Sequence, residues 1–239
     1  MEFTNTYEDA RRAAAYAELG LGGTYHLAFR DLPAIFRERV PGRRAVDFGC
    51  GTGRSTRWLK SLGYEAVGLD ISAEMVAIAR SRDPGGDYRV IADGDLSSLP
   101  PGSFDLVLSA FTFDNIPGFA RKVRLFAGLR SLLQPSGKVV SIVSTPAIYT
   151  HEWVTFSTRD FPENASAGCG DVVRIVTTDY SDARPVDDVL WPEADYRAVY
   201  RAAGLEPEHL VQPLARGDEG IDWVSETGVA PWAIWVLRR

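Results

Sequence analysis

Three glycines follow directly on an apolar segment, in the stretch Val46-Asp47-Phe48-Gly49-Cys50-Gly51-Thr52-Gly53. Each glycine costs backbone entropy on folding, so this pattern indicates a tight strand-to-helix turn where the main chain approaches a ligand closely. A second apolar run ends at Asp70, where a carboxylate would reach the hydroxyl groups of a ribose. Together, the turn and the acid predict that the chain binds a cofactor that contains a nucleoside.

The spacing of the glycines separates two kinds of nucleoside cofactor. A dinucleotide turn has the pattern G-x-G-x-x-G, whereas here the third glycine, Gly53, comes one residue early. Asp47 lies just before the turn, where a carboxylate would repel a pyrophosphate but would suit a ligand with an ammonium group and a sulfonium. The residues therefore favour a sulfonium nucleoside over NAD. A NAD-dependent dehydrogenase stays as an alternative, although its Tyr/Lys or Ser constellation is absent.

The segment from Val46 to Gly53, taken with Asp70, resembles motif I and the second-strand acid of the class I S-adenosylmethionine-dependent methyltransferases. The resemblance continues in the family's order through further stretches at residues 90–96, 99–100, 102–107 and 132–140. It implies an α/β fold, with a Rossmann-like, doubly wound and mostly parallel seven-stranded sheet that ends in a C-terminal antiparallel hairpin. It also implies S-adenosylmethionine as the cofactor, with S-adenosylhomocysteine as the product.

Hydrophobic patterning predicts one domain made of four parts. Strands that alternate with helices of about ten residues indicate parallel β-α-β units. Before them, the glycines of a hinge at 20–23 precede one helix expected from about His26 to Arg39. The expected parts are an N-terminal helical cap at 1–42, the cofactor-binding core at 43–144, an insertion over the acceptor site at 145–191, and a C-terminal helix with antiparallel strands at 192–239.

Within the core, the resemblance assigns the turn to the methionine part of the cofactor. Gly49, Gly51 and Gly53 would pass beneath that part, with Cys50 as a backbone position between them. Asp47 would contact the amino group of the cofactor, directly or through water. The alternative interpretation is an ordinary turn without a ligand.

The resemblance assigns a second group of residues to the nucleoside and the sulfonium. Asp70 would accept hydrogen bonds from both ribose hydroxyls, and without a ligand it would cap the next helix. Asp95 would read the edge of adenine, and Asp93 competes with it for this role. Ile71 would cover one face of adenine, and the amide of Leu96 would bond to the adenine edge. Ser109 and Ala110 would flank the sulfonium.

Methyl transfer from a sulfonium needs nucleophile, methyl carbon and sulfur in line, so alignment and exclusion of water matter most. A base is needed only if the nucleophile holds its proton. The candidates are His26 after the hinge, His151 in an aromatic and acid–base stretch, and Asp114, which could hydrogen-bond the acceptor; each could also be purely structural. We expect the acceptor wall to include Tyr7, Tyr16, Tyr25, Arg30, Phe111, Asn115, Tyr149 and Trp153.

Composition narrows the class of acceptor. The formal charge of −6, without a Lys/Arg cluster, argues against a nucleic-acid partner. The loop after the fourth expected strand reads Ser109-Ala110-Phe111-Thr112 and lacks the (Asp/Asn)-Pro-Pro-aromatic pattern that nucleobase amine methylases share. No apolar stretch approaches the span of a bilayer, and two cysteines are too few for a disulfide framework or a zinc site. We therefore expect a cytoplasmic protein with a small-molecule acceptor, no membrane and no metal; oligomeric state is left open.

The function predicted from these observations is methyl transfer to a nitrogen or oxygen of a small planar metabolite. The helical cap and the Trp-rich C-terminal strand are most similar to bacterial small-molecule methyltransferases of secondary metabolism, such as antibiotic biosynthesis. The stretches 151–164 and 231–235 also resemble the enzymes that methylate azapteridine nitrogens in toxoflavin-type pathways. A cofactor-binding protein without catalysis, in regulation or assembly, is the other alternative.

Overall fold

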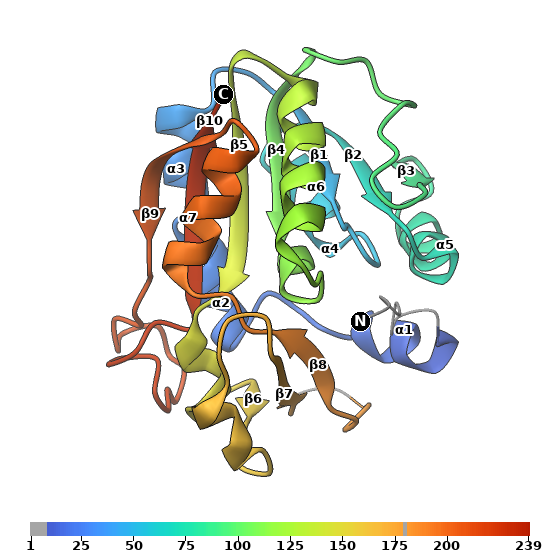
Figure 1. Ribbon diagram of the computed structural model, residues 1–239. Coiled ribbons are helices and arrows are strands. Elements are labelled where there is room, and N and C mark those ends of the chain that lie inside the picture. The colour runs from blue at the N-terminus through green and yellow to red at the C-terminus, as the bar shows by residue number, and fades with distance from the viewer. Residues whose placement is uncertain (1–8, 179–180) are drawn as a thin grey trace.

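The structure, a computed structural model, describes residues 9–178 and 181–239. Its centre is a seven-stranded sheet in the order β3-β2-β1-β4-β5-β10-β9 (Figure 1). Strands β1 to β5 run parallel, and β10 pairs antiparallel with both β5 and β9, which confirms the predicted sheet. The strands are β1 Arg44–Phe48, β2 Glu65–Asp70, β3 Asp87–Val90, β4 Phe104–Ala110, β5 Leu133–Ser144, β9 Glu206–Val211 and β10 Trp232–Arg238.

Helices cover both faces of this sheet because its middle strands are apolar on both sides. β4 and β10 are buried along almost their whole length, as strands between two helical layers must be. Helices α2, α3 and α4 pack on one face, and α6 and α7 pack on the other (Figure 1). The helices are α1 Ala10–Tyr16, α2 Thr24–Arg30, α3 Leu32–Arg39, α4 Arg54–Ser61, α5 Ala73–Arg82, α6 Phe119–Leu132 and α7 Glu193–Ala202. Within the described residues, no helix has the length and apolar character that crossing a membrane requires.

The single helix expected from His26 to Arg39 is wrong, because the structure divides this segment into α2 and α3 at Asp31. Pro33 lies in the first turn of α3 and has no N–H to donate back to α2, so α2 cannot continue through it. α2 also begins two residues earlier than expected, at Thr24.

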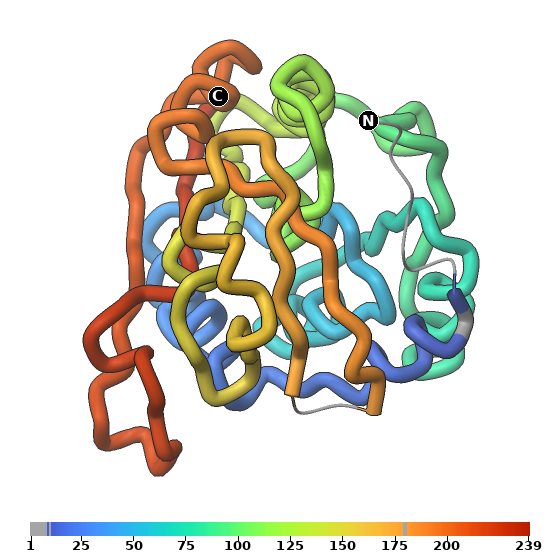
Figure 2. Tube along the Cα trace, turned by 60° about the horizontal axis from the view of Figure 1, so that its bottom comes forward, coloured from blue at the N-terminus to red at the C-terminus, as the bar shows by residue number. Residues whose placement is uncertain are grey.

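Residues 145–191 contain a three-stranded antiparallel sheet, which we call the small sheet: β6 Phe156–Ser157, β7 Val172–Thr177 and β8 Val186–Val189. Two short 3-10 helices precede β7, η3 Pro146–Tyr149 and η4 Pro162–Ser166. The small sheet lies at the lower end of the molecule in Figure 1 and crosses the front of Figure 2. It therefore lies at the carboxyl ends of the parallel strands, the edge where α/β proteins bind ligands.

Buried polar groups join residues 154–155, just before the small sheet, to the start of α2. The amides and hydroxyls of Thr24 and Thr155 bond reciprocally, at 2.9 and 3.1 Å. Glu226, fully buried, accepts hydrogen bonds from the Thr24 hydroxyl and from the amide of Val154. Gly23 has φ +55°, and a Cβ there would lie 2.2 Å from the Thr155 hydroxyl, so only glycine permits this approach.

Candidate active site

A cavity of about 450 Å³ lies between the carboxyl ends of the parallel strands and the small sheet. It opens where the strand order reverses, between β1 and β4, which is the topological switch point of such sheets. One end is bounded by the glycine turn and Asp70, and the other by aromatic side chains and the small sheet. Its volume is in the range of sites for small molecules and cofactors.

The glycine turn brings its main chain to the wall of this cavity at Gly49 and Gly51. Both have positive φ, +75° and +52°, and a Cβ on Gly49 would lie 2.1 Å from the Thr112 hydroxyl. Gly53 also has a positive φ, +78°, but does not line the cavity, because a Cβ there would meet the ring of Tyr88 at 2.7 Å. Gly53 therefore lies against Tyr88 of β3, and its assignment to the cofactor stays a prediction.

The carboxylate of Asp70 is fixed at the cavity wall by two main-chain amides. Its Oδ2 accepts a hydrogen bond from Gly51 N at 2.8 Å, and its Oδ1 accepts one from Ser72 N at 2.9 Å. Burial raises the pKa of this carboxyl. Each carboxylate oxygen keeps a lone pair for a further donor, such as a ribose hydroxyl. Ile71 and Met75 line the cavity beside it.

Asp47 and Cys50, which lie next to or within the glycine turn, do not line the cavity. Asp47 is fully buried, and its Oδ2 accepts hydrogen bonds from the hydroxyls of Ser55 at 2.7 Å and Thr56 at 2.6 Å. Burial raises the pKa of Asp47 to about 6, and its Oδ1 has no protein partner in the described part of the chain. A direct contact of Asp47 with the cofactor is therefore not supported, which leaves a contact through water. Cys50 is buried toward Gly68 and does not reach the cavity.

The two acids considered for the edge of adenine differ in their position relative to the cavity. Asp93 and Gly94 line the cavity, whereas Asp95 and Leu96 do not. Gly94 has φ +72°, and after this turn Asp95 points to solvent and accepts a hydrogen bond from Ser97 N. Asp93 is therefore better placed for the adenine edge, while the assignment of Asp95 and Leu96 stays a prediction without support from the cavity.

At the end of β4 the side chains alternate between the two sides of the sheet edge, as a strand requires. Ala110 lines the cavity, but Ser109 is buried away from it, which corrects the expectation that both flank the sulfonium. Phe111 follows with φ +65°, an uncommon conformation for an aromatic residue, and its amide donates to the carbonyl of Ile142 at 2.8 Å. Such strain at a cavity wall is typical of functional sites.

Aromatic rings form the wall opposite the glycine turn. Tyr25, Phe111 and Trp232 pack together, with ring centroids 4.6 Å apart for Phe111 and Trp232 and 5.3 Å apart for Tyr25 and Phe111. Phe156 of the small sheet lies 5.2 Å from Tyr25. All four rings line the cavity, as do Tyr16 and Asn115.

Five other candidates do not line the cavity. His26 is half-buried beside Glu219, at 3.8 Å, and Arg30 pairs with Asp31 at 2.9 Å and with Glu219. His151 Nδ1 lies 3.1 Å from the carbonyl of Ala147. The side chains of Tyr149 and Trp153 point into the protein to bond partners there, Asp188 and the carbonyl of Ile148. Neither histidine is thus placed to act as a base, and Tyr7 lies outside the described residues.

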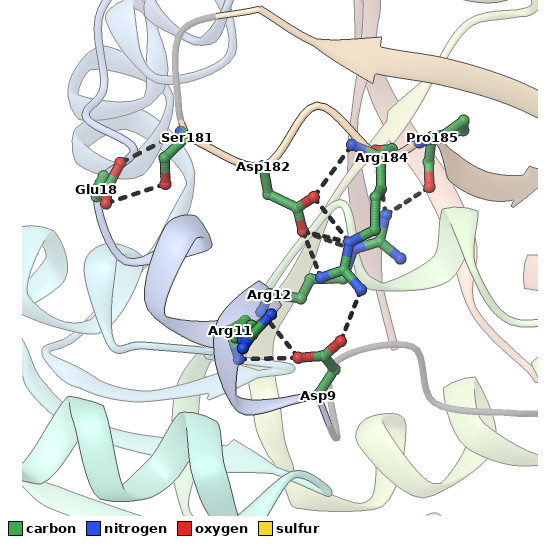
Figure 3. Close-up of polar contacts among 8 residues, drawn as sticks. All are labelled: Asp9, Arg11, Arg12, Glu18, Ser181, Asp182, Arg184 and Pro185. Atoms are coloured by element: carbon green, nitrogen blue, oxygen red, sulfur yellow. Dashed lines mark hydrogen bonds and ion pairs between the residues drawn. The ribbon is translucent and has the colours of Figure 1, made fainter.

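Helix α1 lies across the cofactor end of the cavity, with the ring of Tyr16 next to Gly51, and ion pairs hold it to the loop before β8 (Figure 3). Asp9 caps α1 and pairs with Arg184 at 2.6 Å. Arg184 also pairs with Asp182 at 2.7 Å, and Asp182 lies 3.7 Å from Arg12 of α1. We call this set of four residues the α1 clamp.

Several residues at the cavity carry no signal in the sequence. Phe156, Asp188 and Trp232 come from segments far from the glycine turn, and only the packing of the small sheet and β10 brings them to it. The Trp-rich ending of the chain was visible, but nothing in it indicates which indole faces a ligand. Met75, Thr112 and Ser144 complete this group.

The strand order, the glycine turn after β1 and the acid at the end of β2 define the class: the protein has the fold of the class I S-adenosylmethionine-dependent methyltransferases. Residues 46–141 match the family described as "Methyltransferase domain". The matched residues cover less than half of the chain, from β1 to β5 of the large sheet, and over them the chain is similar to that family. This match favours a methyltransferase over the dehydrogenase alternative.

Relatives of known name cover only part of the chain. The "Ubiquinone biosynthesis O-methyltransferase" of Xanthomonas euvesicatoria is 34% identical over 119 residues, 47% of this chain and 48% of that protein. The protein of that name from Burkholderia thailandensis is 34% identical over 104 residues, 42% of this chain and 44% of that protein. The chain thus spans about half the length of these curated relatives.

Solved structures resemble the chain over most of its length. The CcbJ methyltransferase from Streptomyces caelestis has a TM-score of 0.68 at 18% identity, covering 99% of both chains. An S-adenosylmethionine-dependent methyltransferase from Mesorhizobium loti has a TM-score of 0.61 at 22% identity, covering 91% of this chain and all of the other. At such identity the likeness shows the fold alone.

Proposed function

We propose that the protein transfers the methyl group of S-adenosylmethionine to a nitrogen or oxygen of a small planar metabolite. The observation that carries this proposal is one cavity with the glycine turn and Asp70 at one end and an aromatic wall at the other. Methyl transfer needs both ligands next to each other, and this cavity offers adjoining places for them. The curated relatives, which are named as O-methyltransferases, support a small acceptor.

The residues at the cavity fit the cofactor. The glycine turn presents only main chain where the methionine part would lie, because Gly49 and Gly51 line the cavity and carry no side chain. Asp70 is held by amides in an orientation that leaves lone pairs for two ribose hydroxyls, and Ile71 and Met75 offer apolar surface for adenine. When bound, S-adenosylmethionine supplies an electrophilic methyl group on a sulfonium.

The protein's own part in the reaction is to orient the acceptor and to exclude water. Tyr25, Phe111 and Trp232 give a flat apolar surface on which a planar ring would stack, which limits its position relative to the glycine turn. The small sheet covers the acceptor end, and α1 covers the cofactor end, so the reacting atoms would be shielded from solvent. We assign no role in the reaction to His26 or His151.

We further propose a role in secondary metabolism, such as antibiotic biosynthesis, without contact to nucleic acid or membrane. The acidic balance of the chain and the cover of the small sheet support a free small molecule over a base within a polymer. The likeness to azapteridine N-methyltransferases stays a prediction, as does the cytoplasmic location.

The test is transfer of a labelled methyl group from S-adenosylmethionine to the small-molecule fraction of a crude metabolite extract. We expect labelled product with the wild-type protein and a loss of about tenfold or more with Trp232→Ala, which removes part of the aromatic wall. Binding of the cofactor without any transfer would favour the non-catalytic alternative, and absence of cofactor binding would refute the proposal.

A further inference from the structure

Two buried carboxylates face the acceptor end of the cavity. Asp114 follows β4 on the 3-10 helix η2 Thr112–Asp114, and Asp188 belongs to β8 of the small sheet. Both line the cavity, yet only 5% and 8% of their surfaces are exposed. One comes from the core and the other from the small sheet, and both line the same cavity in the space proposed for the acceptor.

In the part of the chain that the structure describes, the hydrogen bonds that orient this pair come from neutral donors. Asp114 accepts from the amide of Ser144, at 3.1 and 3.2 Å, and from its hydroxyl at 2.9 Å. Asp188 accepts from the hydroxyl of Tyr149 at 3.0 Å and from the side-chain amide of Asn115. These donors orient the carboxylates but do not neutralise them.

A lysine nearby gives the pair at most one positive charge. Lys122 of α6 is fully buried, and its Nζ donates to the carbonyl of Phe113 and lies 4.9 Å from the ring centroid of Trp191. The other titratable groups that face the pair are Tyr149 of η3, Tyr196 of α7 and Asp187 of β8. Two carboxylates thus share one ammonium group, so both can be ionised together only when a further cation balances the second charge.

Burial of these groups disfavours their charged forms. It raises the pKa of Asp114 to about 6 and that of Asp188 to about 8, and Asp114 adds to the rise at Asp188. It also lowers the pKa of Lys122 to about 7. A cation bound in the cavity would reverse this cost, because an opposite charge within a few ångströms favours the ionised carboxylate.

The aromatic wall favours a ligand of the same charge. Phe111, Phe156 and Trp232 surround the acceptor end, and the faces of aromatic rings attract ammonium groups. The ring of Tyr25 is already covered by the guanidinium of Arg54, 4.5 Å from its centroid. Aromatic rings together with carboxylates that have no full complement of cations are typical of sites that recognise amines. A carboxylate or phenolate ligand would meet repulsion at the same place.

We propose that the acceptor is a primary or secondary amine, which enters as an ammonium ion and hydrogen-bonds to Asp114 and Asp188. This inference rests on the proposed function and narrows it to nitrogen. One N–H proton passes to a carboxylate oxygen of the pair, which frees the nitrogen lone pair. The lone pair forms the bond to the methyl carbon while the carbon–sulfur bond breaks, its electrons staying on sulfur. The products are a methylated ammonium ion and a neutral thioether.

The test compares benzylamine with its neutral counterpart benzyl alcohol, each titrated calorimetrically into protein saturated with S-adenosylhomocysteine. We expect the wild-type protein to bind benzylamine about tenfold or more tightly than benzyl alcohol near neutral pH. Asp188→Asn and Asp114→Asn should each abolish most of this preference while leaving the affinity for benzyl alcohol. Glu163→Gln, which changes an exposed carboxylate of the same insertion, is the matched control and should behave as wild type.

Equal affinity for the two probes, or a preference for benzylamine that survives both substitutions, overturns the inference. Absence of benzylamine binding by the wild type does so too. Affinity for S-adenosylhomocysteine is measured first on every variant, because it reports both on folding and on the proposed function. A protein that binds S-adenosylhomocysteine but does not prefer the amine keeps the proposed function and loses only this inference.

Discussion

Replacing Asp70 by alanine should weaken the binding of S-adenosylhomocysteine by about 3 kcal/mol, or roughly a hundredfold. The carboxylate is placed to accept two hydrogen bonds from ribose hydroxyls, because its orientation is fixed by the amides of Gly51 and Ser72. Hydrogen bonds to a charged group contribute about 1.5–3 kcal/mol each. We use the lower figure for each, since part of this carboxylate's charge is already stabilised by the two amides.

The assay is isothermal titration calorimetry with S-adenosylhomocysteine, and Asp95→Ala is the matched control. Asp95 is exposed and lies outside the cavity, so its loss should leave the affinity unchanged. Asp70→Ala also leaves two amides without partners, so thermal unfolding is recorded to show that the variant folds. A change of less than about threefold for Asp70→Ala, or an equal loss for Asp95→Ala, would refute the assignment of the ribose site.

Four further predictions concern other parts of the site. His26→Ala should leave turnover within about twofold of wild type, since the imidazole lies outside the cavity; a loss of tenfold in a methyl-transfer assay would restore it as a base. Trp232→Ala should destabilise the protein by about 3–5 kcal/mol in urea unfolding, because the indole is almost fully buried; a change below about 1 kcal/mol would contradict its packing role. Arg184→Ala should speed the release of S-adenosylhomocysteine in stopped-flow experiments, as should high salt with the wild type, whereas the exposed Arg159→Ala should not; an unchanged rate would mean that the α1 clamp does not hold the cofactor. Burial raises the pKa of Asp188 to about 8, so the folded state holds this proton more tightly than the unfolded chain, and stability should fall as pH rises from about 4 to about 8. The free energy of unfolding of Asp188→Asn should therefore rise relative to that of wild type by more than about 1.4 kcal/mol between pH 4 and pH 8. The same difference between variant and wild type at both pH values, measured by urea unfolding, would show that Asp188 does not cause the pH dependence.

The cofactor end was largely predictable because its residues follow one another in the chain. The glycine turn and Asp70 belong to consecutive β-α-β elements, whose pattern determines where the carboxyl ends of the strands meet. The predictions lack support from the cavity where a single backbone angle decides the outcome. Gly94 turns Asp95 away from the cavity, and Gly53 is needed for the ring of Tyr88, which no spacing rule shows.

The acceptor end was not predictable to the same degree, because long-range packing builds it. The sequence predicts a site role for Asp114, which follows β4 on η2. Its counterpart Asp188 lies in the small sheet, and no local pattern in the sequence connects the two. The two histidines were predicted as bases from the chemistry of imidazole alone. His26 lies beside Glu219 and His151 beside the carbonyl of Ala147, and these positions are outcomes of packing.

The α1 clamp has a consequence for the order of events during turnover. It joins α1, which lies over the cofactor end, to the loop before β8 of the small sheet, which lies over the acceptor end. Neither element can therefore move far while the other stays in place. Loading and unloading of the two ligands would then be coupled mechanically. S-adenosylhomocysteine would leave fastest after release of the methylated product had broken the ion pairs of the α1 clamp. Product release would then follow an ordered kinetic scheme and not a random one.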